Sequence, residues 1–167
     1  MNSIAVREMS PDDVKSIAVI EKASYTMPWP ETSFLGEVYS PTSIKRVAEL
    51  KGKIIAYICI KQVSDEAVLM NLTVDSAYRR QGIATMLFNN AGTVLRENGC
   101  RFLYLEVRES NIAARKMYEK LNFTIVGTRR DYYVDPRENS LVMRLDLLGV
   151  SSSAPARTVQ GPHPLQQ

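Results

Sequence analysis

The sequence predicts a single α/β domain with a mixed, mostly antiparallel sheet and helices on both faces. Three strand-like segments joined by short turns occupy residues 44–74, which favours an antiparallel meander. A strand–helix–strand succession over residues 67–107 then implies a parallel strand pair linked by a crossover helix. The length of 167 residues is that of about one domain, and 45% hydrophobic with 23% charged residues is ordinary for a globular protein.

Capping and proline signals set the helices of the first half. Ser10 and Pro11, followed by two aspartates, form a helix start with Ser10 as N-cap and proline at the first helical position. Apolar spacing carries this helix to about Tyr25, and Pro28 and Pro30 prevent it from continuing. The expected elements are a strand over 4–9, helices over 11–25 and 31–38, and strands over 44–50, 54–63 and 67–74.

The second half alternates helices and strands. Apolar residues at helical spacing begin at Ile83, and Asn98 followed by Gly99 ends that helix. The expected elements are a helix over 83–97, a strand over 102–107, a helix over 111–122, and strands over 123–128 and 141–145 separated by a polar segment. From about Gly149 the chain is rich in Ser, Pro and Gln, so we expect a folded domain over 1–148 and a disordered tail over 149–167.

Composition and charge exclude several classes of protein. The net charge of +3 is too small and dispersed to argue for nucleic-acid binding. The apolar runs have the length of strands, so no membrane-spanning helix is expected, and the first residues show no secretory signal. Cys59 and Cys100 lie in or beside apolar strand-like runs and are expected to be reduced, buried residues of a cytoplasmic protein. The pattern does not predict an oligomeric state.

The chain contains almost no histidine for metal binding or catalysis. The one histidine, His163, lies in the expected tail, so no cluster of metal ligands can be assembled and no metal is expected. The same scarcity excludes Ser-His-Asp and Cys-His nucleophilic catalysis.

The stretch from Met70 to Ala91 has the order strand, basic turn, helix. Its turn carries Arg79, Arg80 and Gly82, and a helix N-terminus offers unpaired N–H groups that suit an anion. The glycine-rich fingerprints of P-loops and dinucleotide sites are absent, and what remains is the short motif R-x-x-G-x-A. Two interpretations therefore stand: a phosphate or pyrophosphate site, or a solvated basic loop that caps an ordinary helix.

The strand over 102–107 carries one carboxylate between two largely apolar faces. Both faces are expected to be covered, which places Glu106 in a setting of low polarity. A buried carboxylate usually has a partner or a raised pKa, and such groups gather at functional sites. The alternative is that Glu106 lies at the strand's end, solvated or paired with Arg108, and spacing does not decide between the two.

Three other residues have ordinary structural explanations. Tyr118 has the helical spacing of a core residue, Asn111 has the position of an N-cap, and Trp29 is expected to act as a hydrophobic plug. For Trp29 the functional alternative is a position along a substrate cleft.

Five motifs taken together resemble one enzyme family. They are YRRQGIAT at 78–85, LEVRESN at 105–111, AARKMYEKLNF at 113–123, MPWP at 27–30 and RRDYY at 129–133. In this order they resemble the GNAT acetyltransferases, and within them the ribosomal-protein alanine N-acetyltransferases and related protein N-terminal acetyltransferases. The similarity runs over residues 4–145. The joint occurrence is far more specific than any one motif.

The resemblance implies a fold and a coenzyme site. The central strands of the sheet would splay and leave a wedge for the pantetheine arm of acetyl-CoA. The backbone of Leu72, Thr73 and Val74 would pair with that arm, and Asn111 would contact the coenzyme near its thiol. The pyrophosphate would be held by the backbone amides of Arg80, Gln81, Gly82, Ile83, Ala84 and Thr85. Ala84 stands where many members have glycine, which the pattern tolerates.

The resemblance also implies catalytic and substrate residues. Glu106 matches the family's general base and Tyr118 its general acid, while Trp29, Tyr132 and Tyr133 fall where the subgroup lines its peptide cleft. The expected activity is acetyl transfer from acetyl-CoA to the N-terminal amine of a protein, with a ribosomal protein that begins with alanine as the substrate. The alternatives are acetylation of a lysine or a small-molecule amine, and a non-catalytic domain that binds coenzyme A or the ribosome.

Overall fold

The computed structural model describes residues 3–149. Within them the chain forms strands, four α-helices and two short 3₁₀ helices, η1 (Pro11–Asp13) and η2 (Ser76–Tyr78). The helices are α1 (Val14–Ser24), α2 (Glu31–Tyr39), α3 (Ile83–Glu97) and α4 (Ile112–Lys120). The strands are β1 (Ala5–Glu8), β2 (Ser43–Leu50), β3 (Lys53–Val63), β4 (Glu66–Val74), β5 (Phe102–Arg108), β6 (Thr124–Val134) and β7 (Arg137–Asp146).

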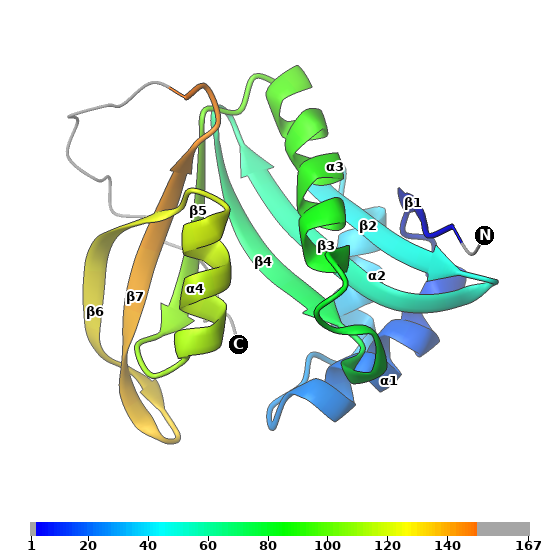
Figure 1. Cartoon of the computed structure of the whole chain (residues 1–167), viewed down its shortest axis with the longest axis horizontal. Coiled ribbons are helices and arrows are strands. Elements are labelled where there is room, and N and C mark those ends of the chain that lie inside the picture. The colour runs from blue at the N-terminus through cyan, green and yellow to red at the C-terminus, as the bar shows by residue number, and fades with distance from the viewer. Residues whose placement is uncertain (1–2, 150–167) are drawn as a thin grey trace.

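The described strands form one sheet of seven strands in the order β1-β2-β3-β4-β5-β7-β6. Every neighbouring pair is antiparallel except β4 and β5, which are parallel and joined through α3 (Figure 1). The predicted fold class, a mixed and mostly antiparallel sheet with a crossover helix, is therefore confirmed.

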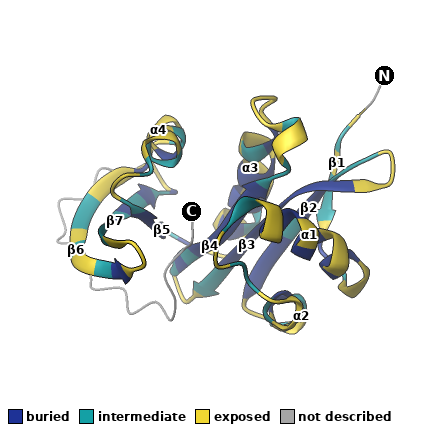
Figure 2. Ribbon diagram, turned by 90° about the horizontal axis from the view of Figure 1, so that it is seen from below, coloured by how far each residue is buried: buried dark blue, intermediate teal, exposed yellow. Residues whose placement is uncertain are grey.

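The helices cover both faces of the sheet. Seen along the edge of the sheet, α3 and α4 lie on one side and α1 and α2 on the other (Figure 2). The strands between them are mostly buried. Successive side chains of β3 and β4 point to opposite faces of the sheet, and helices cover both faces. Both cysteines lie in this interior as buried free thiols, as expected from the sequence.

The parallel pair at the centre of the sheet is short. Only three positions pair, Glu66 with Phe102, Ala67 with Leu103 and Val68 with Tyr104. Beyond them β4 continues to pair with β3 and β5 continues to pair with β7, while the two central strands diverge (Figure 1). The splayed central pair that the family resemblance implied is present.

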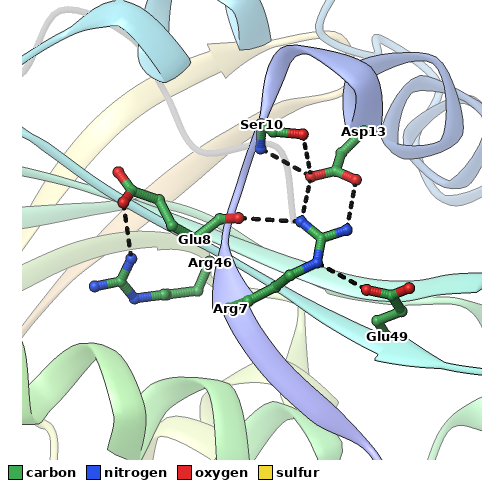
Figure 3. A network of polar contacts seen from close by, with 6 residues as sticks. All are labelled: Arg7, Glu8, Ser10, Asp13, Arg46 and Glu49. Carbon is green, nitrogen blue, oxygen red and sulfur yellow. Dashed lines mark hydrogen bonds and ion pairs between the residues drawn. The ribbon is translucent and has the colours of Figure 1, made fainter. Parts of the chain in front are cut away.

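A polar network fixes the first strand to its neighbours. The Arg7 guanidinium makes two hydrogen bonds of 2.8 Å to the carboxylate of Asp13, and its Nε donates to Glu49 at 2.7 Å (Figure 3). The backbone N–H of Ser10 donates to the same Asp13 carboxylate at 2.8 Å, and this bond belongs to a capping box formed by Ser10 and Asp13. Arg7 thus ties β1 to β2 and to the start of the first helix.

The largest error of the sequence prediction concerns residues 129–140. We expected a polar segment between two short strands, whereas β6 continues to Val134 and β7 begins at Arg137. The polar residues form the two arms of a hairpin, whose exposed outer faces tolerate them. The expected tail from residue 150 onward, with His163, lies outside the described residues. Among the described helices none is long and apolar enough to cross a membrane.

Candidate active site

The candidate site lies at the end of the sheet where β4 and β5 diverge. Figure 1 shows that the turn before α3, the connection between α1 and α2, and the tip of the β6–β7 hairpin all lie at this end. Arg80 to Gly82 lie in the first of these segments and Trp29 in the second, while Tyr132 and Tyr133 lie in the β6 arm of the hairpin. Two strand ends that separate within one sheet expose backbone groups that a ligand can pair with.

The basic turn before α3 has the geometry of an anion-binding loop. Gly82 is the N-cap of α3 with φ of 75°, and Arg80 also has a positive φ of 62°. Such left-handed residues turn successive N–H groups toward one point. Arg79 is used for the turn itself, since its Nε donates to the carbonyl of Val74 at 3.1 Å. Arg80 is exposed at the loop surface.

The first turn of α3 continues this arrangement. Ile83 is buried and anchors the helix in the core, while Gln81, Gly82 and Thr85 are exposed and Ala84 is half-buried. The first N–H groups of a helix have no partner within it and carry the positive end of its dipole. The predicted residues Arg80 to Thr85 therefore do come together at one helix N-terminus.

The strand on the other side of this turn presents its backbone to the splay. Leu72, Thr73 and Val74 lie in β4 beyond the last residue that pairs with β5. A bulge precedes them: Asn71 pairs with Cys59 and Leu69 with Ile60, so Met70 is an extra residue on β4. A bulge leaves its extra residue outside the ladder and bends the strand, which frees backbone groups at the entrance to the splay.

Glu106 lies in β5 on the far side of the splay. It is 8% exposed, and its Oε1 lies 3.0 Å from Nε of Arg129 in β6. The hydroxyl of Tyr132 donates a hydrogen bond to the same carboxylate. Burial raises the pKa of Glu106, and the Arg129 charge and the Tyr132 hydrogen bond only partly oppose this. Arg108, the partner considered from the sequence, instead pairs with Glu138 at 3.4 Å.

The two tyrosines of the hairpin have different surroundings. Burial and the negative charge of Glu106 raise the pKa of Tyr132 to about 12, so its hydroxyl remains a donor. Tyr133 is 3% exposed, with the Arg108 guanidinium 4.0 Å from its ring centroid and a hydrogen bond to Ser140. Tyr132 is therefore placed beside Glu106, whereas Tyr133 is buried in contact with Arg108 of β5 and Ser140 of β7.

The two predicted residues of α4 both have structural partners. Asn111 is the N-cap, and its Oδ1 accepts from the N–H of Ala114 at 3.2 Å. Tyr118 is fully buried, with its ring edge-on to Phe123 at a centroid distance of 5.6 Å. These contacts agree with the structural explanations of Asn111 as an N-cap and Tyr118 as a core residue.

Trp29 lies in the connection between α1 and α2, half-buried against Phe34 with ring centroids 5.4 Å apart. Its backbone N–H donates to Oε1 of Glu21 at 3.3 Å. Glu21 is 1% exposed, and its carboxylate also accepts from the Tyr57 hydroxyl and from Nδ2 of Asn71. This buried carboxylate ties the Trp29 segment to β3 and β4.

Several residues of the site were missed from the sequence. Glu21 occupies the apolar stripe of α1, and an acid on such a stripe is a signal of a buried partner network. The Tyr25 hydroxyl lies 2.8 Å from Oγ1 of Thr73, which joins the end of α1 to the strand beside the splay. Arg129 stands in the motif RRDYY, yet nothing in the motif alone shows which acid it pairs with.

The pieces of the site suit direct transfer between two bound molecules. One side of the splay offers an anion-binding helix start and open strand backbone, and the other side offers Glu106 with a raised pKa. A carboxylate with a raised pKa is a stronger proton acceptor than an ordinary one. Such an arrangement is typical of an acyltransferase that uses a coenzyme with a diphosphate.

Comparison with known proteins agrees with this conclusion. The model of the Acetyltransferase (GNAT) family matches residues 14–123, and the chain belongs to the GNAT family of acetyltransferases. Within that family it is 36% identical over 152 residues to the [ribosomal protein bS18]-alanine N-acetyltransferase of Escherichia coli strain K12. That match covers 88% of this chain and 99% of the relative. The resemblance stated from the five motifs is confirmed.

Solved structures show the same fold. The ribosomal-protein-S18-alanine N-acetyltransferase from Escherichia coli superposes with a TM-score of 0.81 at 30% identity, covering 91% of this chain and 99% of that one. PaiA N-acetyltransferase from Thermoplasma acidophilum, solved in complex with coenzyme A, has a TM-score of 0.73 at 17% identity, covering 86% and 99%. At that identity the second likeness shows the fold alone.

Proposed function

We propose that this protein transfers an acetyl group from acetyl-CoA to the N-terminal α-amine of a protein, with the N-terminal alanine of a ribosomal protein as the acceptor. The observation that carries the proposal is the splay of β4 and β5, which has an anion-binding helix start on one side and a buried carboxylate on the other. Family membership and the name of the Escherichia coli relative support the reaction and the acceptor.

The coenzyme would occupy the splay between the two strands. The amides of Arg80, Gln81, Gly82, Ile83, Ala84 and Thr85 would hold the pyrophosphate, and Leu72 to Val74 would pair with the pantetheine arm. Asn111 would approach the thiol end from the start of α4. The crystal structure of the PaiA enzyme with coenzyme A supports the use of this fold for that ligand.

The reaction requires one proton to leave the amine and one to reach the sulfur. The amine nitrogen attacks the thioester carbonyl, a C–N bond forms, and the C–S bond breaks. Glu106 would accept the proton that the nitrogen loses, and the Tyr118 hydroxyl would give a proton to the departing thiolate. The bulge at Met70 would supply backbone N–H groups to the oxyanion. Much of the acceleration would come from holding the two reactants together.

The acceptor chemistry favours an α-amine. Its pKa is about 7.7–8.0, against about 10.4 for a lysine side chain, so a single moderately basic carboxylate is sufficient. The connection between α1 and α2 and the β6–β7 hairpin lie on opposite sides of the splay (Figure 1). A peptide N-terminus would enter between Trp29 of that connection and Tyr132 of β6.

A panel of synthetic peptides tests the proposal. The peptides begin with Ala, Ser, Met or Gly, and matched peptides carry a blocked N-terminus and a single lysine. After incubation with acetyl-CoA, mass spectrometry is expected to find acetylation of the alanine peptides at the α-amine. Acetylation of the blocked lysine peptides instead would contradict the proposed acceptor, and acetylation of no peptide would contradict the proposed function.

A further inference from the structure

The ion pair between Glu106 and Arg129 places a cation at the base of the proposed reaction. The two atoms lie 3.0 Å apart, and the side chains are 11% and 28% exposed, so solvent and salt screen the pair less than a surface pair. A carboxylate that works alone would attract the ammonium form of an amine. A carboxylate already paired with a guanidinium attracts an ammonium group much more weakly, because the guanidinium charge offsets its own.

The other charged and titratable groups around Glu106 leave this balance unchanged. From β6, Tyr132 donates a hydrogen bond to it and Tyr133 stands next along the strand. Arg108 of β5 and Glu138 of β7 form an ion pair of their own at 3.4 Å, so their charges offset each other. Arg129 is therefore the group whose charge decides whether this corner of the site is neutral or negative.

We propose that Arg129 determines substrate specificity by admitting the neutral form of the acceptor amine and disfavouring its ammonium form. This inference rests on the proposed function, and it names the residue that separates α-amines from lysine side chains. Removing the guanidinium would leave Glu106 free to pair with an ammonium group in its place.

The size of the discrimination follows from the two pKa values. At pH 7.5 about a third of an α-amine is neutral, whereas only about 0.1% of a lysine side chain is. Admission of the neutral form alone therefore favours the α-amine by roughly 200-fold. The neutral nitrogen carries the lone pair that attacks the thioester, and its proton passes to Glu106 after the new bond forms. The positive charge of Arg129 favours the deprotonated form of Glu106 until then and partly opposes the effect of burial.

The test measures binding without turnover. An alanine-initiated peptide is titrated by calorimetry into the wild-type protein saturated with coenzyme A, at pH 6.5 and at pH 8.5. The expected affinity is about 20-fold higher at pH 8.5, because that is the ratio of the neutral amine fractions. The same peptide with a lactyl group in place of alanine has a hydroxyl instead of the amine, and its affinity corrects for pH effects on the protein.

Three variants assign the effect. The corrected ratio is the affinity at pH 8.5 divided by that at pH 6.5, after correction with the lactyl peptide. Arg129→Gln is expected to reduce this ratio to below about 3-fold, because the ammonium form then pairs with Glu106. Arg129→Lys retains the positive charge and is expected to keep most of the ratio. Arg130→Gln removes an exposed neighbouring charge and is expected to behave as wild type.

Each outcome separates the inference from the proposed function. A wild type that acetylates alanine peptides but binds them equally at both pH values would overturn the inference alone. So would Arg129→Gln with an unchanged ratio, or Arg130→Gln with an equal loss. A wild type that acetylates no alanine peptide would overturn the proposed function, and the wild-type measurement stands even if Arg129→Gln does not fold.

Discussion

Two buried glutamates lie on opposite sides of the splay, and they are held in different ways. Glu21 accepts hydrogen bonds from the uncharged groups of Tyr57, Asn71 and the Trp29 backbone. Glu106 is held by the cation of Arg129 and by the Tyr132 hydroxyl. Burial raises the pKa of both carboxyls. Uncharged donors fix a segment in place, whereas a cation within reach also favours the ionised form of a buried carboxylate.

The pKa of a third carboxylate, that of Asp13, shows the effect of the number of hydrogen bonds that a buried acid accepts. Burial works against the ionisation of Asp13, yet two hydrogen bonds from Arg7 and one from the Ser10 N–H bring its pKa below the usual value. Glu106 also has an arginine partner, but its pKa stays raised. A bidentate pair at the edge of the sheet stabilises the fold, while the looser pair at the splay leaves a carboxylate that can accept a proton.

The strongest way to test this contrast is to remove the charge of Glu106. Glu106→Gln is expected to lower kcat for an alanine peptide by about 10²–10⁴-fold, the usual contribution of a general base. Coenzyme A binding, measured by calorimetry, is expected to remain unchanged because the helix start of α3 is untouched. The wild-type kcat/KM should rise with pH through the raised pKa of Glu106, since only the ionised form accepts a proton.

The control for this variant is Glu109→Gln, which removes an exposed acid just beyond β5. It is expected to retain wild-type kcat. Full turnover by Glu106→Gln with intact coenzyme binding would remove Glu106 from the mechanism.

Removal of the Glu21 carboxylate is expected to affect stability more than chemistry. Glu21→Ala would leave the Tyr57 hydroxyl, the Asn71 amide and the Trp29 N–H without their acceptor. The expected loss is about 2–4 kcal/mol in the free energy of unfolding, measured by urea denaturation.

Glu21→Gln is the matched control, because it keeps the shape of the side chain and one acceptor oxygen. The raised pKa of Glu21 means that its contribution to stability is present below about pH 4.3 and is lost as pH rises through the folded pKa. Glu21→Gln should lack this decline. Equal pH dependence in the two proteins would show that Glu21 does not titrate differently on folding.

The smallest effect is expected at the edge of the sheet. Arg7→Ala should cost about 1–2 kcal/mol of unfolding free energy, a modest value because the Arg7 side chain is 39% exposed and solvent screens its charge. The Asp13 pKa is lowered on folding, so the contribution of this pair is complete above about pH 4 and is lost as pH falls through the folded pKa.

Arg46→Ala is the comparison for Arg7, since Arg46 lies 3.9 Å from Glu8 and makes a weaker pair (Figure 3). Its loss is expected to be below about 1 kcal/mol. A larger loss for Arg46 than for Arg7 would contradict the importance given to bidentate geometry.

The fold could be predicted from the sequence because its signals are local. Ser10 and Pro11 set the start of the first helix, and Gly99 with a φ of 75° ends α3 as its type suggested. The sequence predicts only a polar segment where the arms of the β6–β7 hairpin meet, because its polar residues carry no alternation that periodicity can detect. Tertiary pairing with the apolar face of β7 overrides that composition.

The site was predicted less completely because its contacts cross the chain. The pairing of Glu106 with Arg129 joins β5 to β6 across β7. Directly after Arg129 the hairpin has a bulge, where three residues of β6 lie opposite one residue of β7 between Arg129 and Tyr133. That bulge positions Tyr132 beside Glu106, and no short window of sequence encodes it. The basic turn at Gly82 was found from the sequence because one local conformation determines it.

One part of the described sheet consists of β1 to β4, and the other consists of β5, β7 and β6. The three paired positions between β4 and β5 are the only direct strand pairing between these two parts. A coenzyme arm lying between the diverging strands would act as a brace across that joint. A ligand present at a hundred times its dissociation constant adds about 2.7 kcal/mol to the stability of the state that binds it. The resistance of the folded protein to proteolysis would then increase with the concentration of acetyl-CoA.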